Sequence, residues 1–426
     1  MASVDDMIIR VILKILYFIG LYFVFFWIYV LIEHRNREDN INSRRVWPEI
    51  TIVIPVYNEE DCLNRTISKL YEVDYPKDKL KVICVNDGSK DNSLKILKKL
   101  NKKYPFKLID QKNQGKFMAM NNALEIIDTP IFACIDADSF IEKHSLKRIV
   151  ECFDDSDVAA ATPMMKVYNP QNILVRAQWL EYMINMFYVK IFSKINCMHV
   201  VPGPLGTYRT SVVKKLGLFR EGHKTEDLEM GMRLQSNHYK IKHCHTATIY
   251  TKSPETTKGV IDQRIRWYKG TILNLKDYKH MIFNKSYGDF GFFHIPLVAI
   301  SGLMIILGVF AFVYGQIKAL VKTIREWAMQ DFDWSVIFGD ISFKFDILTF
   351  DWKAWFLSII MLLSTVLIVH YSLKNGREKL KIFTKISDFF TLVFYFFVYN
   401  FIMFYIWLKV FYAVIFRKDY KWYKVR

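Results

Sequence analysis

Four stretches of this sequence contain no Asp, Glu, Lys or Arg, and they limit what the chain can fold into more than any other feature. They span residues 15–32, 290–316, 354–373 and 389–408. Each is close to the length of about 20 apolar residues that a helix needs to cross a bilayer. A helix in a soluble core rarely stays uncharged over that distance. The chain is therefore expected to be an integral membrane protein embedded in a lipid bilayer.

The first apolar stretch also has the alternative of a secretory signal peptide, which would be removed from the mature chain. It is long for that role, and no small-residue cleavage site follows it. The polar flank that comes next is instead rich in basic residues: His34, Arg35, Arg37, Arg44 and Arg45. A retained anchor is favoured. Because basic loops stay on the cytosolic side, residues 34–289 are expected to face the cytosol at the cell (plasma) membrane.

Two bulk features narrow the class of protein. The net charge is +17, which either lysine and arginine beside membrane segments or nucleic-acid binding would explain. No recognisable nucleic-acid-binding module accompanies the charge, so no nucleic-acid partner is expected. All six cysteines lie between Cys62 and Cys244 without a CxxC or other metal spacing. In a reducing cytosol they are expected to be buried thiols and not disulfides.

Residues 50–270 have the pattern of a soluble α/β domain. Runs of β-branched residues that indicate buried strands alternate with segments of helical spacing. The expected strands cover residues 50–55, 81–85 and 130–135, and the expected helices cover residues 63–71 and 93–100. Strands that alternate with helices imply a mostly parallel sheet with crossover connections.

Polar residues follow each of the three expected strands. They are Asn58, Glu59, Asn86, Asp87, Gly88, Asp136 and Asp138. In open parallel sheets, ligands bind at the carboxyl ends of the strands. These side chains are therefore expected to converge on one crevice.

Residues 171–195 form an amphipathic pattern in which apolar residues recur every three or four positions. A helix of this kind can simply pack on the sheet. The flanking Trp179, Tyr182 and Tyr188 favour the alternative that it lies at the membrane surface and supports the domain there.

Asp136 and Asp138 are candidates for metal binding. They are two residues apart directly after an apolar strand, so both carboxylates share a side of an extended chain. Carboxylate oxygens suit hard cations such as Mg²⁺ or Mn²⁺, which can neutralise a diphosphate leaving group. An Asp-x-Asp pair also occurs by chance on solvated loops.

Glu226 and Asp227 are candidates for a general base. They occupy the first turn of an expected helix that Thr225 would cap. A carboxylate there can remove the proton of an acceptor hydroxyl. The ordinary alternative is an acidic helix start, which the helix dipole favours in any protein.

Gln263, Arg266 and Trp267 share one face of a helix because they are spaced i, i+3 and i+4. A guanidinium group binds diphosphate in a forked geometry, and an indole ring can stack on a sugar. The alternative is an Arg/Trp anchor at the membrane interface, since an apolar stretch begins shortly afterwards.

Two weaker signals complete the set. Lys116 follows a glycine and can approach a phosphate. Gly203 and Pro204 belong to a rigid loop of small residues, which is either a plain turn or a neck through which a sugar passes.

The order of these elements resembles the family 2 processive glycosyltransferases, a group that includes cellulose, chitin, hyaluronan and poly-N-acetylglucosamine synthases. The resemblance covers about residues 48–270, and Asp-x-Asp, Thr-Glu-Asp and Gln-x-x-Arg-Trp in this order are specific to it. It implies an α/β GT-A domain inserted between transmembrane helices. The expected parts are an N-terminal anchor with its basic flank (1–47), a cytosolic catalytic domain with interfacial helices (48–285) and a C-terminal transmembrane region (286–426).

The resemblance also implies roles for single residues. The nucleotide-sugar would be bound by Pro55, Tyr57, Glu59, Asp87, Lys116 and Asp136, with Tyr57, Glu59 and Asp87 at the uracil. Asn86 stands where the family usually has another aspartate. Asp138 would bind the metal, and Asp227 would be the catalytic base with Glu226 beside it. The acceptor and diphosphate would be held by Gly203, Pro204, Gln263, Arg266 and Trp267.

The function implied is the inverting transfer of sugar from a UDP-sugar to a growing polysaccharide, coupled to translocation. Thr225-Glu226-Asp227 and the short chain are closest to the poly-N-acetylglucosamine type. The alternative is a non-processive enzyme that adds single sugars to a lipid-linked or short glycan acceptor. A channel or transporter is disfavoured because the apolar stretches lack acidic residues for an ion path. The expected partners are the UDP-sugar donor, the glycan acceptor and the lipid bilayer. The sequence does not show whether an accessory subunit also takes part.

The C-terminal topology is a separate question. Four crossings would place residues 417–426 outside, whereas the basic residues of this tail favour the cytosolic side. One late segment, 290–316 or 389–416, is therefore expected to be broken, re-entrant or interfacial.

Overall fold

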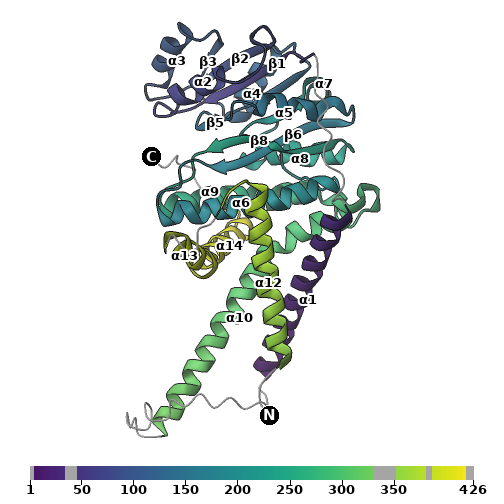
Figure 1. Cartoon of the computed structure of the whole chain (residues 1–426), viewed down its shortest axis with the longest axis vertical. Coiled ribbons are helices and arrows are strands. Elements are labelled where there is room, and N and C mark those ends of the chain that lie inside the picture. The colour runs from purple at the N-terminus through teal and green to yellow at the C-terminus, as the bar shows by residue number, and fades with distance from the viewer. Residues whose placement is uncertain (1–3, 34–45, 330–351, 380–385, 419–426) are drawn as a thin grey trace.

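The computed structural model describes residues 4–33, 46–329, 352–379 and 386–418 (Figure 1). The basic flank expected after the first span and most of the basic C-terminal tail lie outside these ranges. What the structure describes is an α/β domain with a group of long helices on one side of it.

Within the described residues, eight strands form one mixed sheet in the order β3-β2-β1-β4-β7-β6-β8-β5. Their bounds are β1 Ile50–Val56, β2 Leu80–Asp87, β3 Lys107–Gln111, β4 Ile131–Cys134, β5 Ser139–Ile141, β6 Val158–Val167, β7 Gly206–Arg209 and β8 Lys240–Thr251. The strands β3, β2, β1 and β4 are parallel to one another. Strand β7 then runs antiparallel between β4 and β6. The parallel half brings its strand ends to one edge, as expected.

Helices cover both faces of this sheet because alternate residues of each central strand are apolar on both sides. Ile52 and Ile54 of β1 face a core that includes α2 (Leu63–Tyr71), α3 (Ser93–Asn101) and α5 (Ser145–Val150). Val53 and Phe132 face the opposite core, with α4 (Lys116–Glu125), α7 (Thr210–Lys215) and α8 (Glu226–Ser236). The expected α/β class is confirmed.

The three expected strands and the two helices between them are present, whereas strands β3, β5, β6, β7 and β8 were not predicted. Strands β1, β2 and β4 and helices α2 and α3 agree with expectation to within one or two residues at their ends. Strand β3 was not recognised. It is five residues long and carries exposed polar side chains at the sheet edge, so it lacks the continuous apolar run of a buried strand.

Helix α6 (Ile173–Lys194) is the expected amphipathic helix, and it has contacts on two sides. It packs on β6 and β8, and it also contacts α12 (Trp352–Asn375) and α13 (Ile386–Val393). Arg176 forms an ion pair with Asp388 of α13. Lys166 of the adjacent strand β6 reaches Glu378, just beyond α12, with an N–O distance of 3.0 Å. The helix is therefore packed on the sheet and also contacts the C-terminal segments, and its place at the membrane surface stays a prediction.

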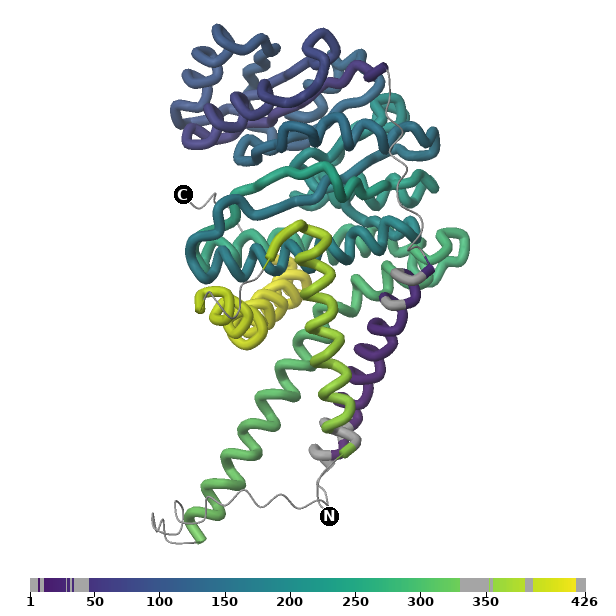
Figure 2. The backbone as a smooth tube through the Cα atoms, in the orientation of Figure 1, coloured from purple at the N-terminus to yellow at the C-terminus, as the bar shows by residue number. Residues whose placement is uncertain are grey.

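Long helices extend from one side of the domain (Figure 2). Among the described helices, three segments are long and apolar enough to cross a membrane: Phe290–Ala328, Trp355–Asn375 and Ile386–Ile415. Helix α1 (Val4–Glu33) contains a shorter apolar part, Val11–Trp27. Helices α1, α10 (Ile295–Ala328) and α12 point away from the domain (Figure 1).

The last apolar segment behaves differently from the others. It is divided into α13, a π-helical turn η7 (Phe394–Tyr399) and α14 (Asn400–Ile415). Helix α14 packs along α9 (Thr257–Asp277) of the domain through Ile406 and Val410. This segment stays beside α6 and α9 and does not extend with α10 and α12 (Figures 1 and 2).

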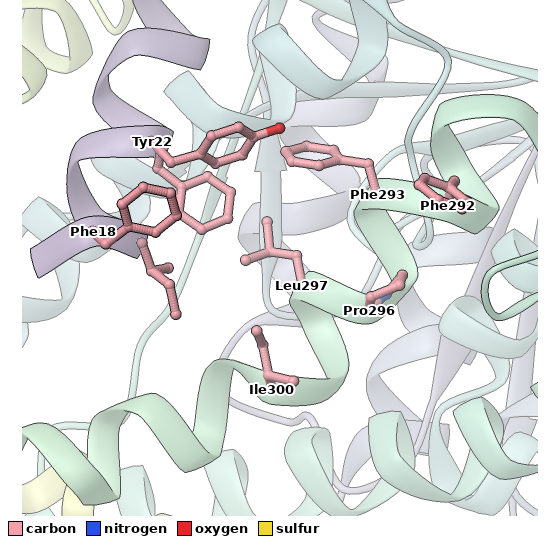
Figure 3. Close-up of a pocket in the computed structure, with 9 residues that line it drawn as sticks. Phe18, Tyr22, Phe292, Phe293, Pro296, Leu297 and Ile300 are labelled. Atoms are coloured by element: carbon pink, nitrogen blue, oxygen red, sulfur yellow. The ribbon is translucent and has the colours of Figure 1, made fainter. Parts of the chain in front are cut away.

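An apolar cavity of about 310 Å³ lies between α1 and the start of α10 (Figure 3). Aromatic side chains line much of it, including Phe18 and Tyr22 of α1 and Phe293 opposite them. Its walls carry almost no polar surface, so this cavity suits hydrocarbon and not a charged nucleotide.

The first prediction concerns the contact between α8 and α9. A β-carbon added to Gly270 of α9 would lie 2.4 Å from Oγ1 and 3.1 Å from the β-carbon of Thr225. The short Thr225 side chain cannot move away, so Gly270→Ala is expected to force the helices apart. Overpacking of this kind costs roughly 1–3 kcal/mol.

Thermal unfolding in detergent is the measurement, and Gly308→Ala in α10 is the matched control. No heavy atom lies within 4 Å of the β-carbon that the control adds. Alanine in an open helical position is otherwise favourable by up to about 1 kcal/mol. A Gly270→Ala midpoint equal to that of the control would show that the two helices are not in close contact.

Candidate active site

The site is built on the end of β2 and the start of α4. Asp87, the last residue of β2, is buried, and its carboxylate accepts hydrogen bonds from the backbone N–H groups of Gln114 (2.9 Å) and Gly115 (3.0 Å). The Gln111 amide donates a third, at 2.8 Å. Gly115 has φ +90°, a conformation that suits glycine. Asp87 therefore fixes the loop from which Lys116 projects.

Lys116 is the centre of a cluster drawn from three separate motifs. Its ammonium nitrogen lies 2.7 Å from Oδ1 of Asp136 and 3.2 Å from Oε1 of Glu226. A β-carbon on Gly203 would lie 2.4 Å from the same nitrogen and 2.9 Å from Oδ2 of Asp136. The loop that carries Gly203 and Pro204 thus approaches the ion pair closely because residue 203 has no side chain. The structure thus brings Lys116, Asp136, Gly203 and Glu226 together.

The two carboxylates at the start of α8 have different proton affinities. Burial and the neighbouring charge of Glu226 raise the pKa of Asp227 to about 6. Burial opposes ionisation of Glu226 too, but the Lys116 charge, a backbone hydrogen bond and the Arg266 charge together outweigh it and lower the pKa of Glu226. Neighbouring groups whose pKa values are pushed apart are typical of acid–base sites. Near neutral pH Asp227 is the more basic carboxylate of the pair.

Thr225 stands at the N-cap position of α8, but the expected capping hydrogen bond is not formed. Its hydroxyl donates to the Gly222 carbonyl at 2.6 Å and accepts from the Asn274 amide of α9 at 3.1 Å. Asn274 also donates to the Gly222 carbonyl. Thr225 therefore joins α8 to α9 instead of closing the end of its own helix, because Gly270 lets the two helices approach.

Arg266 brings α9 to the acidic pair. One guanidinium nitrogen donates to the Lys224 carbonyl at 2.8 Å, and its charge lowers the pKa of both Glu226 and Asp227. Its Nε is buried and has no hydrogen-bond partner among the described residues. A buried donor without a partner is costly, and an anionic ligand such as a diphosphate would satisfy it.

Gln263 and Trp267 gather around a residue that the sequence analysis did not single out. Arg264 is fully buried, donates to Oε1 of Gln263 at 2.6 Å and lies over the Trp267 ring at 4.3 Å. It also pairs with Glu181 of α6 at 2.6 Å. The one signal available from the sequence was Glu181, a glutamate inside the amphipathic helix. That signal did not identify Arg264 as the partner of Glu181.

Asp136 and Asp138 are separated in the sequence by Ala137. Both aspartate side chains are partly exposed, whereas Ala137 is buried. Asp138 accepts a hydrogen bond from the Ser139 hydroxyl at 3.1 Å and influences Cys62 and Lys252 electrostatically. No group of three metal-ligating side chains occurs among the described residues. A magnesium or manganese ion that takes one or two carboxylates and completes its shell with diphosphate oxygens and water fits this donor set.

The loop after β1 is held against the loop after β2. Asn58 has φ +55°, its backbone N–H donates to Ser89, and its side chain accepts from the Lys90 N–H. The Glu59 N–H donates to Ser93. Pro55, near the end of β1, and Tyr57 and Glu59, on this loop, are only partly buried. They remain candidates for a nucleotide site next to Asp87.

A family model provides the first comparison with known proteins. The family described as glycosyltransferase like family 2 matches residues 48–270, more than half of the chain. The match takes in both carboxylates at the start of α8 and the Gln-x-x-Arg-Trp segment of α9.

Curated relatives agree with this family. Poly-beta-1,6-N-acetyl-D-glucosamine synthase of Staphylococcus aureus (strain MSSA476) is 28% identical over 238 residues, which cover 55% of this chain and 57% of that protein. The synthase of the same name from Staphylococcus epidermidis (strain RP62A) is 27% identical over 266 residues, or 60% of this chain and 64% of that protein. The chain therefore spans less than two thirds of the length of the curated relatives it matches.

A solved structure supports the fold. The mannosyltransferase PcManGT from Pyrobaculum calidifontis, in complex with GDP-Man and Mn²⁺, matches with a TM-score of 0.61 at 17% identity. The match covers 84% of this chain and 97% of that one. The expected GT-A-like architecture is thus confirmed, with apolar helices following the catalytic domain. Because the family model spans the region in which these site residues lie, the chain belongs to glycosyltransferase family 2 and is a glycosyltransferase.

Proposed function

We propose that this glycosyltransferase transfers a sugar with inversion from a UDP-sugar to a growing β-glycan, and that it does so processively. N-acetylglucosamine is the sugar proposed, because the curated relatives are poly-beta-1,6-N-acetyl-D-glucosamine synthases. The observation that carries the proposal is the cluster of Lys116 with Asp136 and Glu226, beside which Asp227 has a raised pKa.

The chemistry assigned to Asp227 is proton removal. The acceptor hydroxyl attacks the anomeric carbon as its proton passes to the Asp227 carboxylate, and the bond from that carbon to the diphosphate oxygen breaks with release of UDP. Glu226 stays ionised beside Lys116, and its negative charge keeps the pKa of Asp227 raised. A base with a pKa near 6 is ionised at neutral pH and still able to accept a proton.

The diphosphate is assigned to Lys116 and Arg266. The buried Arg266 Nε needs an acceptor, and Lys116 lies where Gly203 leaves room for close approach. When bound at Asp138, with Asp136 beside it, Mg²⁺ or Mn²⁺ would supply positive charge to the leaving diphosphate. Pro55, Tyr57, Glu59 and Asp87 are assigned to the uridine side, where Asp87 acts by ordering the Lys116 loop.

The acceptor is assigned to Gln263 and Trp267, with Gly203 and Pro204 on the way to the base. Aromatic rings offer sugars an apolar face, and the Trp267 indole is only partly buried. The catalytic domain is proposed to be cytosolic, with α1, α10 and α12 crossing the bilayer. The segment from α13 to α14 would lie in the interface below α6 and α9, which accommodates a basic tail on the cytosolic side.

The second prediction tests the donor and the product. Purified full-length protein in detergent is incubated with a panel of nucleotide-sugars, and UDP release is measured. UDP-N-acetylglucosamine is expected to give the highest rate, and product length should exceed one added sugar. A product with a single added residue would favour the non-processive alternative, and no UDP release from any UDP-sugar would contradict the proposal.

The third prediction concerns Asp227→Asn, which keeps the shape of the side chain and removes its basicity. Transfer is expected to fall by roughly 100- to 10,000-fold, whereas UDP affinity should persist because the proposed donor contacts lie elsewhere. In the wild type, kcat/KM should rise with pH through about 6, since Asp227 is protonated and inactive below its pKa.

Asp128→Asn is the matched control for this variant, because Asp128 is exposed and pairs with Lys81 at the surface. If UDP binding collapses together with transfer, Asp227 belongs to the donor site. Near wild-type transfer in Asp227→Asn would move the role of base to Glu226.

The fourth prediction concerns Asp138→Asn. An amide oxygen is a weaker ligand for a hard cation than a carboxylate. The variant is expected to lose sugar transfer and to keep the thermal unfolding midpoint of the wild type. If residual UDP release can be measured, half of its maximal rate should require a higher Mn²⁺ concentration than in the wild type. Full wild-type activity in excess EDTA, or normal UDP release by the variant, would exclude Asp138 as a metal ligand.

A further inference from the structure

Arg264 is a charged side chain that the proposed chemistry leaves unexplained. Among fully buried side chains it is the largest in the described part of the chain, with 0% exposure. Burying a charge is unfavourable unless a partner compensates it. Arg264 lies on α9 between Gln263 and Trp267, two residues assigned to the acceptor.

The guanidinium group of Arg264 contacts both of those residues. One of its terminal nitrogens donates to Oε1 of Gln263 at 2.6 Å, and its central carbon lies 4.3 Å from the centre of the Trp267 ring. Tyr182 of α6 also interacts with it. The planar guanidinium group of Arg264 therefore sets the positions of the Gln263 and Trp267 side chains.

Glu181 of α6 holds this guanidinium in place. Its Oε2 accepts from the other terminal nitrogen of Arg264 at 2.6 Å, and the Tyr399 hydroxyl donates to the same oxygen at 2.9 Å. Tyr399 is the last residue of the π-helical turn η7, within the C-terminal apolar segment. Single π-helical turns inside longer helices often occur at functional sites.

We propose that Arg264 is a positioning residue for the sugar acceptor, anchored by Glu181 and, through it, by Tyr399 of the membrane segment. The proposal rests on the function proposed above, which assigns Gln263 and Trp267 to the acceptor. Arginine suits the role because its planar, delocalised cation can stack on an indole while its edges donate to two oxygens. Lysine carries the same charge but cannot form this set of contacts.

The consequence is a separation between acceptor and donor. In the part of the chain that the structure describes, no hydrogen bond or ion pair joins the Arg264 guanidinium to Arg266, Lys116 or Asp136. Loss of the contacts of Arg264 should therefore leave donor binding intact. Displacement of a substrate-positioning group by about 1 Å can cost about 100-fold in rate. Arg264→Lys, Glu181→Gln and Tyr399→Phe form a series that removes progressively less of the network.

The first arm of the test does not depend on catalysis. Full-length protein is labelled with 5-fluorotryptophan, which reports on all 10 tryptophans, and Trp267→Phe identifies the resonance of Trp267 in the ¹⁹F spectrum. Arg264→Lys and Glu181→Gln are expected to shift or broaden this resonance, with a smaller effect from Tyr399→Phe. If Arg264→Lys does not fold, the two milder variants decide the outcome.

The matched control is Arg233→Lys. Arg233 and Glu229 form another buried pair in this domain, with an N–O distance of 2.8 Å and both side chains 5% exposed. The control should destabilise the domain without moving the Trp267 resonance. An unchanged Trp267 resonance in Arg264→Lys and Glu181→Gln, or an equal shift in the control, would overturn the proposal.

The second arm measures transfer from UDP-N-acetylglucosamine to short N-acetylglucosamine oligomers. For Arg264→Lys, kcat/KM for the oligomer is expected to fall about 10- to 100-fold while the donor KM changes less than about twofold. Equal losses for donor and oligomer would overturn the positioning role. If the wild type itself transfers nothing from this donor, the proposed function fails, and the fluorine spectra alone decide whether Arg264 positions Trp267.

Discussion

The charge on Lys116 is the constraint on which the arrangement of this site depends. Asp136 is distant in the sequence from the adjacent Glu226 and Asp227, and bringing three carboxylates together without a cation would be strongly unfavourable. The ammonium group lies within 3.2 Å of two of them. Burial opposes the charge of Lys116, but its anionic neighbours, Asp136 and Glu226 first, together outweigh it and raise the pKa of Lys116 well above its usual value, so it stays protonated. The rest of the domain serves to hold that nitrogen in place, beginning with Asp87 beneath its loop.

The second dependency is mechanical and concerns α9. This helix carries Arg266 toward the carboxylates and places Gly270 against Thr225. It also carries Arg264 together with Gln263 and Trp267, which Arg264 contacts. Its other side packs on α14 through Tyr268 and Trp407, whose rings stack with centroids 4.6 Å apart. Helix α9 therefore links the last apolar segment to the side chains proposed for the chemistry. Displacement of α14 is expected to be felt at the acceptor side before the donor side.

Much of this could be predicted from the sequence, because the parallel half of the sheet has continuous apolar strands with polar residues at their ends. Roles for Lys116, Asp136, Gly203 and Glu226 in one site were implied by the resemblance to the family, and not by any one of these motifs alone. What could not be predicted were contacts that depend on tertiary packing. Thr225 is of a residue type that favours the N-cap position, but its hydroxyl forms a hydrogen bond with Asn274 of the neighbouring helix α9. The Glu181–Arg264 pair joins residues far apart in the chain, and neither residue has a local pattern that identifies the other.

The absence of a side chain at Gly203 has a consequence for sequence variation. Because a β-carbon there would meet both Lys116 and Asp136 within 3 Å, any larger residue requires a compensating change in one of these partners. Substitutions at the three positions should then be strongly epistatic, since effects at residues in contact do not add. Exchanging one loop at a time with a related enzyme would break the site even when each loop is functional in its own setting. Chimeras that aim to alter the donor would need to carry all three segments together.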